Sequence, residues 1–196
     1  TTAANFISTT AAITSTGGNA AGTGNNNGGN GGNISITAPT GVNISQNLTA
    51  TAGTATGTGT AGTAGNFTFD ITAATTTAPN AGQTAGAISG GNLIKNGTGI
   101  LNLGVANASL NGVTNINAGT ILLGNASSLG ATGAAQNTIV ASGATLDLGG
   151  VTTSEPITLN GGTLTNSNAT TAVVNGIVTL TTATTSTINA ANGITF

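Results

Sequence analysis

Histidine, cysteine, methionine, tryptophan and tyrosine are all absent from this chain of 196 residues, and charged residues make up only 2% of it. The charged residues are Lys95, Asp70, Asp147 and Glu155. Without imidazole or thiol, and with three scattered carboxylates, the chain lacks the groups that acid-base, nucleophilic and metal-assisted catalysis use. We therefore expect a protein that is not an enzyme, with no catalytic residues, no metal site and no cofactor.

The shortage of charge also bears on partners. One cation cannot neutralise a row of phosphates, so we expect no nucleic-acid partner. No apolar run approaches the roughly 20 residues of a membrane-spanning helix, so we expect no membrane insertion of this segment. Without cysteine there are no disulfides, and burial and backbone hydrogen bonds must stabilise the fold. The chain starts at Thr1 and stops at Phe196 within a strand-like pattern, which we interpret as an excerpt of a longer protein.

Four small or polar residue types dominate what is present: Thr, Ala, Gly and Asn contribute 42, 32, 33 and 26 residues. Mean hydropathy is +0.26 and net charge is -2, whereas disordered chains combine low hydropathy with high net charge. Asn-Gly dipeptides such as Asn96-Gly97 indicate turns. Between the turns, aliphatic and aromatic residues recur as alternating pairs that place two side chains on one face of a strand, among them Ile34/Ile36, Phe67/Phe69, Leu101/Leu103 and Leu146/Leu148. We expect strands and no helix.

The spacing of these pairs predicts the architecture. Leu101 and Ile121 are 20 residues apart, Ile121 and Leu146 are 25 apart, and Ile157 and Val178 are 21 apart. A period of about 20 to 25 residues with short strands is typical of a parallel β-helix, in which each coil buries its apolar face on the next. We predict an all-β parallel β-helix (β-solenoid) of about nine or ten coils. Asn and Thr side chains should form ladders along its axis.

A longer period is present in the first half. Residues 33–37 match residues 66–70 at a spacing of 33, and Ile7-Ser8 aligns with Ile44-Ser45. Two Gly-rich stretches, residues 17–32 and 53–65, lie between matched strands, and we predict that they are loop excursions from a shorter coil. We therefore expect one continuous solenoid with Gly/Thr/Asn-rich coils in residues 1–88 and more regular coils in residues 89–196.

Residues 89–196 also carry a family resemblance. Residues 93–103 read LIKNGTGILNL, residues 111–121 read NGVTNINAGTI, and Leu129-Gly130 follow. This pattern resembles the passenger-associated transport repeat of bacterial autotransporters, and Lys95 falls at the lysine of that repeat. Residues 28–38, GGNGGNISITA, are similar to the Gly-rich coils of haemagglutinin-like adhesins. The resemblance implies a right-handed β-helix displayed on, or released from, the surface of a Gram-negative-type bacterium.

Three local features admit a functional reading beside a simpler one. Residues 57–62, GTGTAG, fit the dinucleotide fingerprint, but no hydrophobic strand, helix or acidic residue accompanies them, so we interpret them as a loop. Asp147 and Glu155 suit a glycosidase pair, but the alternation places Asp147 toward solvent and Glu155-Pro156 indicates a turn. We interpret Lys95 as a surface or turn residue, which can also pair with a carboxylate or cap a strand end.

Two further features concern the surface. Sequons for Asn-linked sugars occur no more often than the content of Asn, Ser and Thr predicts by chance, so they are not evidence for glycosylation; they begin at Asn33, Asn43, Asn47, Asn66, Asn96, Asn107, Asn125 and Asn168. Thr residues alternate at positions 54, 56, 58 and 60. That row resembles the threonine arrays of ice-binding proteins.

From these observations we predict a non-enzymatic structural segment of a secreted, cell-surface β-helical adhesin or extracellular fibre, serving as stalk or scaffold. The alternative is a self-assembling extracellular filament subunit joined head to tail through its end coils, because uncapped ends are open edges that template pairing. A third hypothesis is a module that binds ice or carbohydrate surfaces. The expected partners are homotypic end-to-end contacts or neighbouring coils of a longer chain; no host or surface ligand is identified.

Overall fold

The computed structural model describes residues 6–9, 11–39, 41–44, 46–72, 83–84, 87–130, 132–133, 136–181 and 184–196. These residues form 21 β-strands and no helix. The strands are short, with lengths from two to five residues. The expectation of many short strands separated by turns is confirmed for the described part of the chain.

The strands belong to four sheets. The eight-stranded sheet contains, in spatial order, β1 (Phe6–Thr9), β4 (Gly41–Ile44), β7 (Gln83–Thr84), β10 (Ile100–Leu103), β12 (Thr120–Leu123), β14 (Thr145–Asp147), β17 (Thr163–Thr165) and β20 (Thr187–Asn189). The seven-stranded sheet contains β3 (Ile34–Ala38), β6 (Phe67–Ile71), β9 (Leu93–Asn96), β11 (Thr114–Ile116), β13 (Thr138–Ala141), β16 (Ile157–Asn160) and β19 (Val178–Leu180). The two three-stranded sheets contain β2 (Ile13–Thr14), β5 (Leu48–Thr49) and β8 (Ile88–Ser89), and β15 (Thr152–Thr153), β18 (Ala172–Val174) and β21 (Ile194–Thr195).

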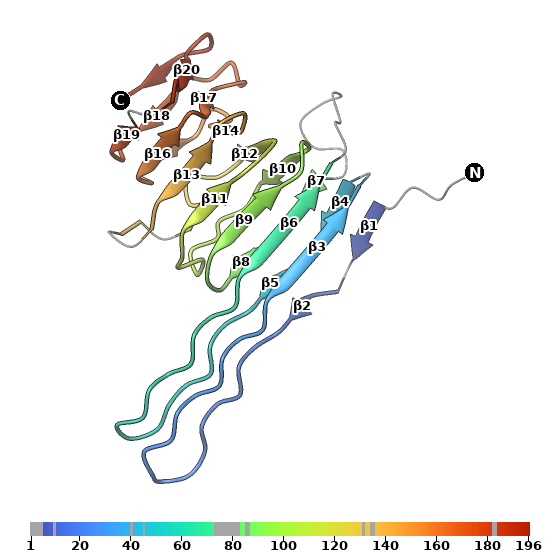
Figure 1. The fold of residues 1–196 in the computed structure, drawn as a ribbon, viewed down its shortest axis with the longest axis vertical. Helices are drawn as coiled ribbons and strands as arrows, with labels where there is room; N and C mark the ends of the chain where they lie inside the picture. The colour runs from blue at the N-terminus through green and yellow to red at the C-terminus, as the bar shows by residue number, and fades with distance from the viewer. Residues whose placement is uncertain are drawn as a thin grey trace, which may run out of the picture.

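The chain returns to these sheets in a repeating order (Figure 1). β1, β2 and β3 enter three different sheets, and β4, β5 and β6 enter the same three sheets in the same order, one strand further on. All strand pairs in the sheets are parallel. Parallel neighbours need a crossover connection, and here the strands of the other sheets supply it. The fold is therefore all-β, with parallel strands in stacked sheets.

The registers of the sheets confirm the spacings read from the sequence. Leu101 pairs with Ile121, and Ile121 pairs with Leu146 in the next strand. Ile157 pairs with Val178. In the second half of the chain, the spacing between apolar residues in the sequence therefore equals the number of residues between paired positions in adjacent strands.

The longer period of the first half is confirmed in one sheet and corrected in another. β3 pairs with β6 in the predicted register, beginning with Ile34 opposite Phe67. The predicted alignment of Ile7 with Ile44 is wrong, because Ile7 pairs with Val42 and Ile44 pairs with Thr9. A shift of the register by two residues leaves the same side chains on the same face of the strand. The alternation of apolar residues therefore could not distinguish the two registers.

The number of layers is also smaller than expected. The longest sheet has eight strands among the described residues, against the nine or ten coils predicted. The reason is the length of the first repeats along the chain: Phe6 pairs with Gly41, and Val42 pairs with Gln83. These repeats use far more residues per layer than the 20 that separate Leu101 from Ile121.

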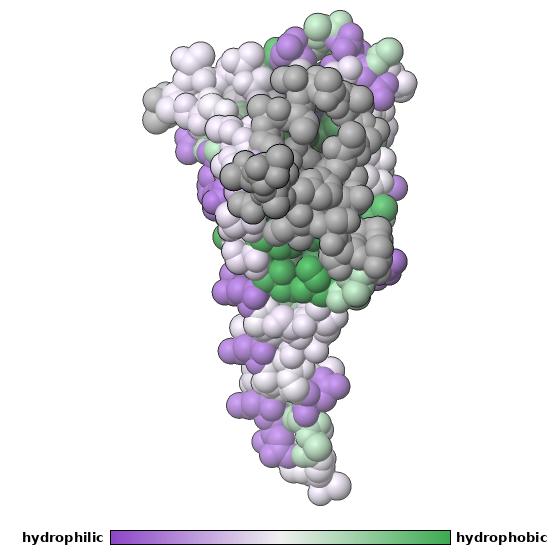
Figure 2. Space-filling model, turned by 90° about the vertical axis from the view of Figure 1, so that its right-hand side faces the viewer, coloured by the Kyte–Doolittle hydropathy of each residue, from purple (hydrophilic) through white to green (hydrophobic). Residues whose placement is uncertain are grey.

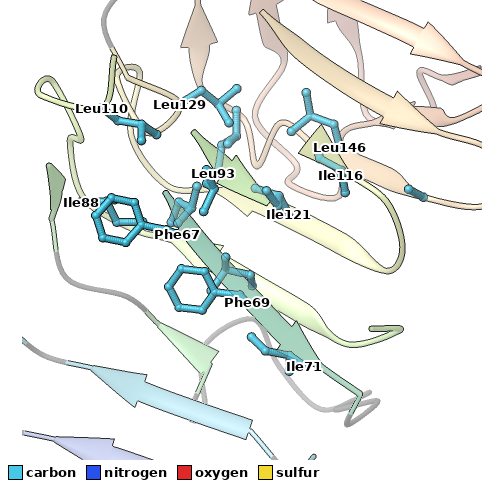
Figure 3. Close-up of a cluster of buried hydrophobic side chains, with 14 of the residues drawn as sticks. Phe67, Phe69, Ile71, Ile88, Leu93, Leu110, Ile116, Ile121, Leu129 and Leu146 are labelled. Atoms are coloured by element: carbon cyan, nitrogen blue, oxygen red, sulfur yellow. The ribbon is translucent and has the colours of Figure 1, made fainter. Parts of the chain in front are cut away.

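The core lies between the sheets and is built from the inward positions of the strands. β3 alternates buried and exposed residues strictly, and β6 alternates buried and half-buried ones. Phe67, Phe69 and Ile71 project from β6 to one side, with Ile88 beside Phe67 (Figure 3), and all four are fully buried. Burying such side chains stabilises the fold by roughly 1.5–3 kcal/mol each.

The two Gly-rich stretches form a projection that we call the arm. Residues 15–33 connect β2 to β3, and residues 50–66 connect β5 to β6. Both leave the sheets as long loops that run side by side away from the body of the molecule (Figure 1). The predicted loop excursions are thus confirmed with slightly wider bounds. In the view of Figure 2 the arm is narrow, and its surface is mostly white and purple with a little pale green. The strong green of apolar residues lies at its base.

Candidate functional site

Lys95 is buried, so the expectation of a surface or turn residue is wrong. Its side chain is 0% exposed. It lies on β9 at an inward position, as Leu93 does, and it pairs with Phe69 on one side and Ile116 on the other. A lysine thus occupies a place in an otherwise apolar column.

The ammonium group of Lys95 caps backbone carbonyls at the end of its strand. Nζ donates to the carbonyl oxygens of Asn96 at 2.6 Å, Gly97 at 2.7 Å and Ala118 at 3.3 Å. Burial lowers the pKa of Lys95 to about 8, and the carboxylate of Asp70 opposes this shift. The contacts reach the corners of two successive layers. The strand-capping alternative for Lys95 is therefore the one that the hydrogen bonds support.

Asp147 is buried as well, which corrects the expectation that it points to solvent. It lies at the end of β14 and is 8% exposed. Its Oδ1 accepts the backbone N–H groups of Gly149 at 3.1 Å and Ser167 at 3.0 Å. The carboxylate of Asp147 thus binds the backbone of two segments, the one that follows β14 and the one that follows β17 in the next layer. Strand alternation failed here because the residue lies where the strand ends and the corner begins.

Glu155 lies in the predicted turn between β15 and β16, but it is buried, with 1% of its surface exposed. Oε1 accepts a hydrogen bond from Thr138 Oγ1 at 3.2 Å. Burial raises the pKa of Glu155 to about 7, and the hydrogen bond from Thr138 opposes this shift. The hydrogen bonds of Glu155 and Asp147 run to different residues, and none joins the two carboxyl groups.

Asparagine side chains form a ladder along the start of the seven-stranded sheet. Asn33 Oδ1 accepts the backbone N–H of Asn66 at 2.9 Å, and Asn66 Oδ1 accepts that of Asn92 at 3.0 Å. Asn92 Oδ1 then accepts the N–H of Val113 at 2.8 Å. Each amide satisfies a backbone donor that precedes a strand in the next layer. This is the asparagine ladder that the composition predicted, now with its positions.

The same device continues into the arm. The Oδ1 atoms of Asn25, Asn27 and Asn30 accept the backbone N–H groups of Thr58, Thr60 and Thr63, at 2.9, 2.8 and 2.9 Å. The donor lies 33 residues after the acceptor in each of these contacts. The two loops of the arm are therefore stacked in the register of the strands at their base.

Glycine permits this stacking. A Cβ at Gly53 would lie 2.0 Å from Gly18 O, and one at Gly62 would lie 2.0 Å from Gly29 O. Gly53 N donates to Gly29 O at 2.8 Å, so the backbones touch where side chains would stand. Every third residue of the stretch 50–66 is at least half-buried: Ala50, Gly53 and Gly65 are buried, and Thr56, Gly59 and Gly62 are half-buried.

This period of three interrupts the threonine row considered for ice binding. Thr56 is half-buried, and its hydroxyl donates to Gly24 O at 2.7 Å, whereas Thr54, Thr58 and Thr60 are exposed. The fingerprint-like residues 57–62 lie in the tip and returning part of the second loop of the arm, with no helix after them among the described residues. That placement agrees with the interpretation as a loop.

The end of the stack formed by β19, β20 and β21 is apolar and open. Each of these strands is the last in its sheet, so one edge carries no neighbour among the described residues. Large side chains are exposed there: Ile177 is 76% exposed, Leu180 55% and Phe196 63%. A groove of about 510 Å³ lies between Val174, Asn175, Gly176, Val178, Leu180, Ile188 and Phe196.

A second, more polar groove of about 380 Å³ follows the corners of the eight-stranded sheet. Its lining includes Asn102, Leu122, Ser167 and Asn168. No charged side chain of the described residues lines it; Asp147 instead holds the backbone of Gly149 and Ser167.

Metal-binding clusters and membrane-spanning helices are both absent from the described part of the chain. These residues contain no group of three or more His, Cys, Asp or Glu that could hold a metal ion. They also contain no helix long and apolar enough to cross a membrane.

Comparison with known proteins adds no relative: no protein-family model, no curated protein and no solved structure matches this chain. The resemblance of residues 89–196 to autotransporter passengers thus stays a prediction from the sequence. Function is therefore inferred from the geometry described above.

Proposed function

We propose that this chain is a non-enzymatic structural segment of a secreted, cell-surface adhesin or extracellular fibre, and that its sheets are the faces of a continuous right-handed β-solenoid that serves as a stalk. The observation that carries the proposal is the parallel, in-register pairing that runs through eight strands of one sheet and seven of another. In such an arrangement each coil contacts mainly its neighbours, so the length of the rod grows with the number of coils.

The composition suits that role. Small uncharged side chains stack at the spacing of strands, about 4.8 Å, without the repulsion that like charges would cause. The asparagine ladder adds side-chain hydrogen bonds parallel to the axis, from Asn33 through Asn66 to Asn92. One lysine and four phenylalanines offer few cleavage points to proteases that cut after basic or aromatic residues. Such a segment suits an extracellular environment.

The rod geometry can be tested with spin labels, because the chain has no cysteine of its own. Gln46 and Thr185 are exposed, and cysteines at these positions lie near opposite ends of the stack. Since about six layers separate β4 from β20, the labels should show one narrow distance distribution centred at roughly 30 Å or more. A broad distribution that matches the distribution measured in denaturant would overturn the rod.

The open apolar end favours a second candidate, the extracellular filament subunit. An exposed edge of parallel strands, with Leu180, Ile188 and Phe196 uncovered, fits either the next coil of a longer chain or the end coil of a second copy. Pairing of unlike ends does not close on itself and gives a filament. We propose such homotypic end contacts as the partner of this face.

Electron microscopy of the purified chain at increasing concentration distinguishes the two candidates. Filaments that lengthen with concentration support the subunit, and single short rods at every concentration support the stalk. Leu180→Lys combined with Ile188→Lys places charge on the open end and should abolish filaments, while Thr58→Lys, at an exposed position of the arm, should not. Filaments that persist in the double variant would exclude this face as the contact.

A further inference from the structure

Glu155 is a buried acid whose surroundings satisfy only half of its carboxyl group. Thr138 Oγ1 donates to Oε1 at 3.2 Å, but Oε2 has no hydrogen-bond partner within the described structure. The backbone N–H of Glu155 donates to Thr153 Oγ1 at 3.2 Å. The neighbouring hydroxyl of Thr114, which pairs with Thr138 across the sheet, is also buried without a partner among the described residues.

No countercharge compensates this acid. The chain has one basic side chain, Lys95, and its Nζ donates hydrogen bonds to backbone carbonyls near the end of β9 and in the next layer. Of the other two acids, Asp147 accepts the backbone N–H groups of Gly149 in its own corner and of Ser167 in the next layer. Asp70 is on β6, which lies beyond β9 and β11 from β13. Among the described residues, the hydrogen bond to the Glu155 carboxyl comes from the neutral hydroxyl of Thr138, which cannot stabilise a negative charge as an ammonium group would.

The next layer rests directly on this turn. A Cβ at Gly176 would lie 2.0 Å from Glu155 O, so the two backbones are in contact. Asn175 N donates to Thr153 O at 2.8 Å, and Ile157 N donates to Ile177 O at 2.9 Å. Asn175 and Gly176 also line the open apolar groove. One layer therefore separates Glu155 from the exposed end of the stack.

We propose that Glu155 is a pH-dependent latch for the end of the stack: the neutral acid holds the turn between β15 and β16 closed, and ionisation opens the layer formed by β18, β19 and β20, together with β21, which pairs with β18. The inference depends on the contacts of Glu155 and stands whether or not the chain forms a stalk. It makes the open end of the molecule a surface whose order depends on the pH of its surroundings.

The direction follows from proton linkage. Burial raises the pKa of Glu155 from 4.5 to about 7, so between those values the folded protein binds more protons than the unfolded one. The contribution of Glu155 to the stability of the folded state is therefore complete below pH 4.5. It declines as the pH rises from 4.5 to 7 and is lost above pH 7. The opening equilibrium of the last layer should rise by up to roughly a hundredfold across it.

Labelling tests the titration directly, because Glu155 is the only glutamate in the chain. Incorporation of glutamate labelled with ¹³C at the side-chain carboxyl gives one resonance, which can be followed from pH 4 to pH 9. We expect a midpoint near 7. A midpoint near 4.5 would overturn the latch, whatever the behaviour of any variant.

Hydrogen exchange tests the consequence. After correction for intrinsic rates, amides of β18 and β19 should exchange faster at pH 8 than at pH 6 in the unsubstituted chain, and equally at both in Glu155→Gln. Asp147→Asn is the matched control, because Asn Oδ1 can still accept from Gly149 and Ser167, and it should keep the pH dependence. Equal pH dependence in Glu155→Gln, or none in the unsubstituted chain, would also overturn the latch.

Discussion

The side chain of Asn33 holds the backbone of Asn66, its counterpart 33 residues later, through a hydrogen bond of 2.9 Å. Asn66 repeats the contact on Asn92. Replacing Asn66 with Ala should therefore remove an acceptor from a half-buried backbone donor and destabilise the fold by about 1–2 kcal/mol. Denaturant unfolding measures this loss. Asn175→Ala is the control, because that exposed side chain makes no hydrogen bond among the described residues and should change stability by less than about 0.5 kcal/mol.

The packing of the arm predicts different effects of alanine substitution at two glycines that lie close together, Gly53 and Gly18. Gly53→Ala should open the arm, because the new Cβ would lie 2.0 Å from Gly18 O, with an expected cost of about 1–3 kcal/mol. Gly18→Ala should be tolerated, since nothing lies within 4 Å of its Cβ position. Hydrogen exchange at Gly29 and Gly62, whose amides are bonded inside the arm, reports the difference. Equal exchange in the two variants would contradict the close backbone packing.

The buried hydroxyls of Thr114 and Thr138 should respond to substitution with opposite signs. Thr114 Oγ1 is buried without a partner among the described residues, so Thr114→Val should stabilise the protein by about 1 kcal/mol. Thr138 Oγ1 donates to Glu155, so Thr138→Val should destabilise it by about 1–2 kcal/mol. The two residues are paired strand neighbours, and valine has nearly the same shape in both places. Thermal unfolding of the two variants at pH 6 should show melting points on either side of the parent value.

Because of Lys95, the stability of the folded protein should depend on pH in the alkaline range. Its pKa in the folded protein is about 8, below the ordinary 10.5, so between these values the unfolded chain binds more protons and stability rises with pH. The chain has no tyrosine or cysteine, and thus no other side chain that titrates in this window. Denaturant unfolding at pH 8 and pH 10.5 should show the rise.

Lys95→Met identifies the source of that dependence. It removes the donor to the carbonyls of Asn96, Gly97 and Ala118, and should lower stability at pH 7 by about 1–3 kcal/mol. It should also abolish the rise between pH 8 and pH 10.5. An unchanged rise in the variant would assign the alkaline dependence to another group.

The strand pairing can be predicted from sequence wherever apolar residues recur at one spacing. Leu101 and Ile121 are such a pair, and the register agrees. The register between β1 and β4 is harder to predict from the sequence. Pairing Ile7 with Val42 or with Ile44 differs by two residues, and both registers place the same side chains on the same face of the strand. Only the hydrogen bonds of the whole ladder select between registers that differ by two.

Sequence reasoning misses the buried charged residues because it treats charge as a signal of exposure. Lys95 shares the alternation of Leu93, which is a usable signal that it points inward. Asp147 and Glu155 lie at a strand end and in a turn, where alternation carries no information, and their partners come from other layers: Ser167 for Asp147 and Thr138 for Glu155. Such contacts depend on the stacking of layers and could not be read from neighbours in the chain.

The strands of each sheet keep their register although the connections between successive strands of a sheet differ widely in length. Val42 pairs with Gln83, 41 residues later, whereas Leu101 pairs with Ile121 after only 20. The surplus residues leave through the corners, and the arm is the largest example among the described residues. Insertions and deletions at the corners are therefore compatible with unchanged sheets, provided that neighbouring corners still stack on one another, as the two loops of the arm do.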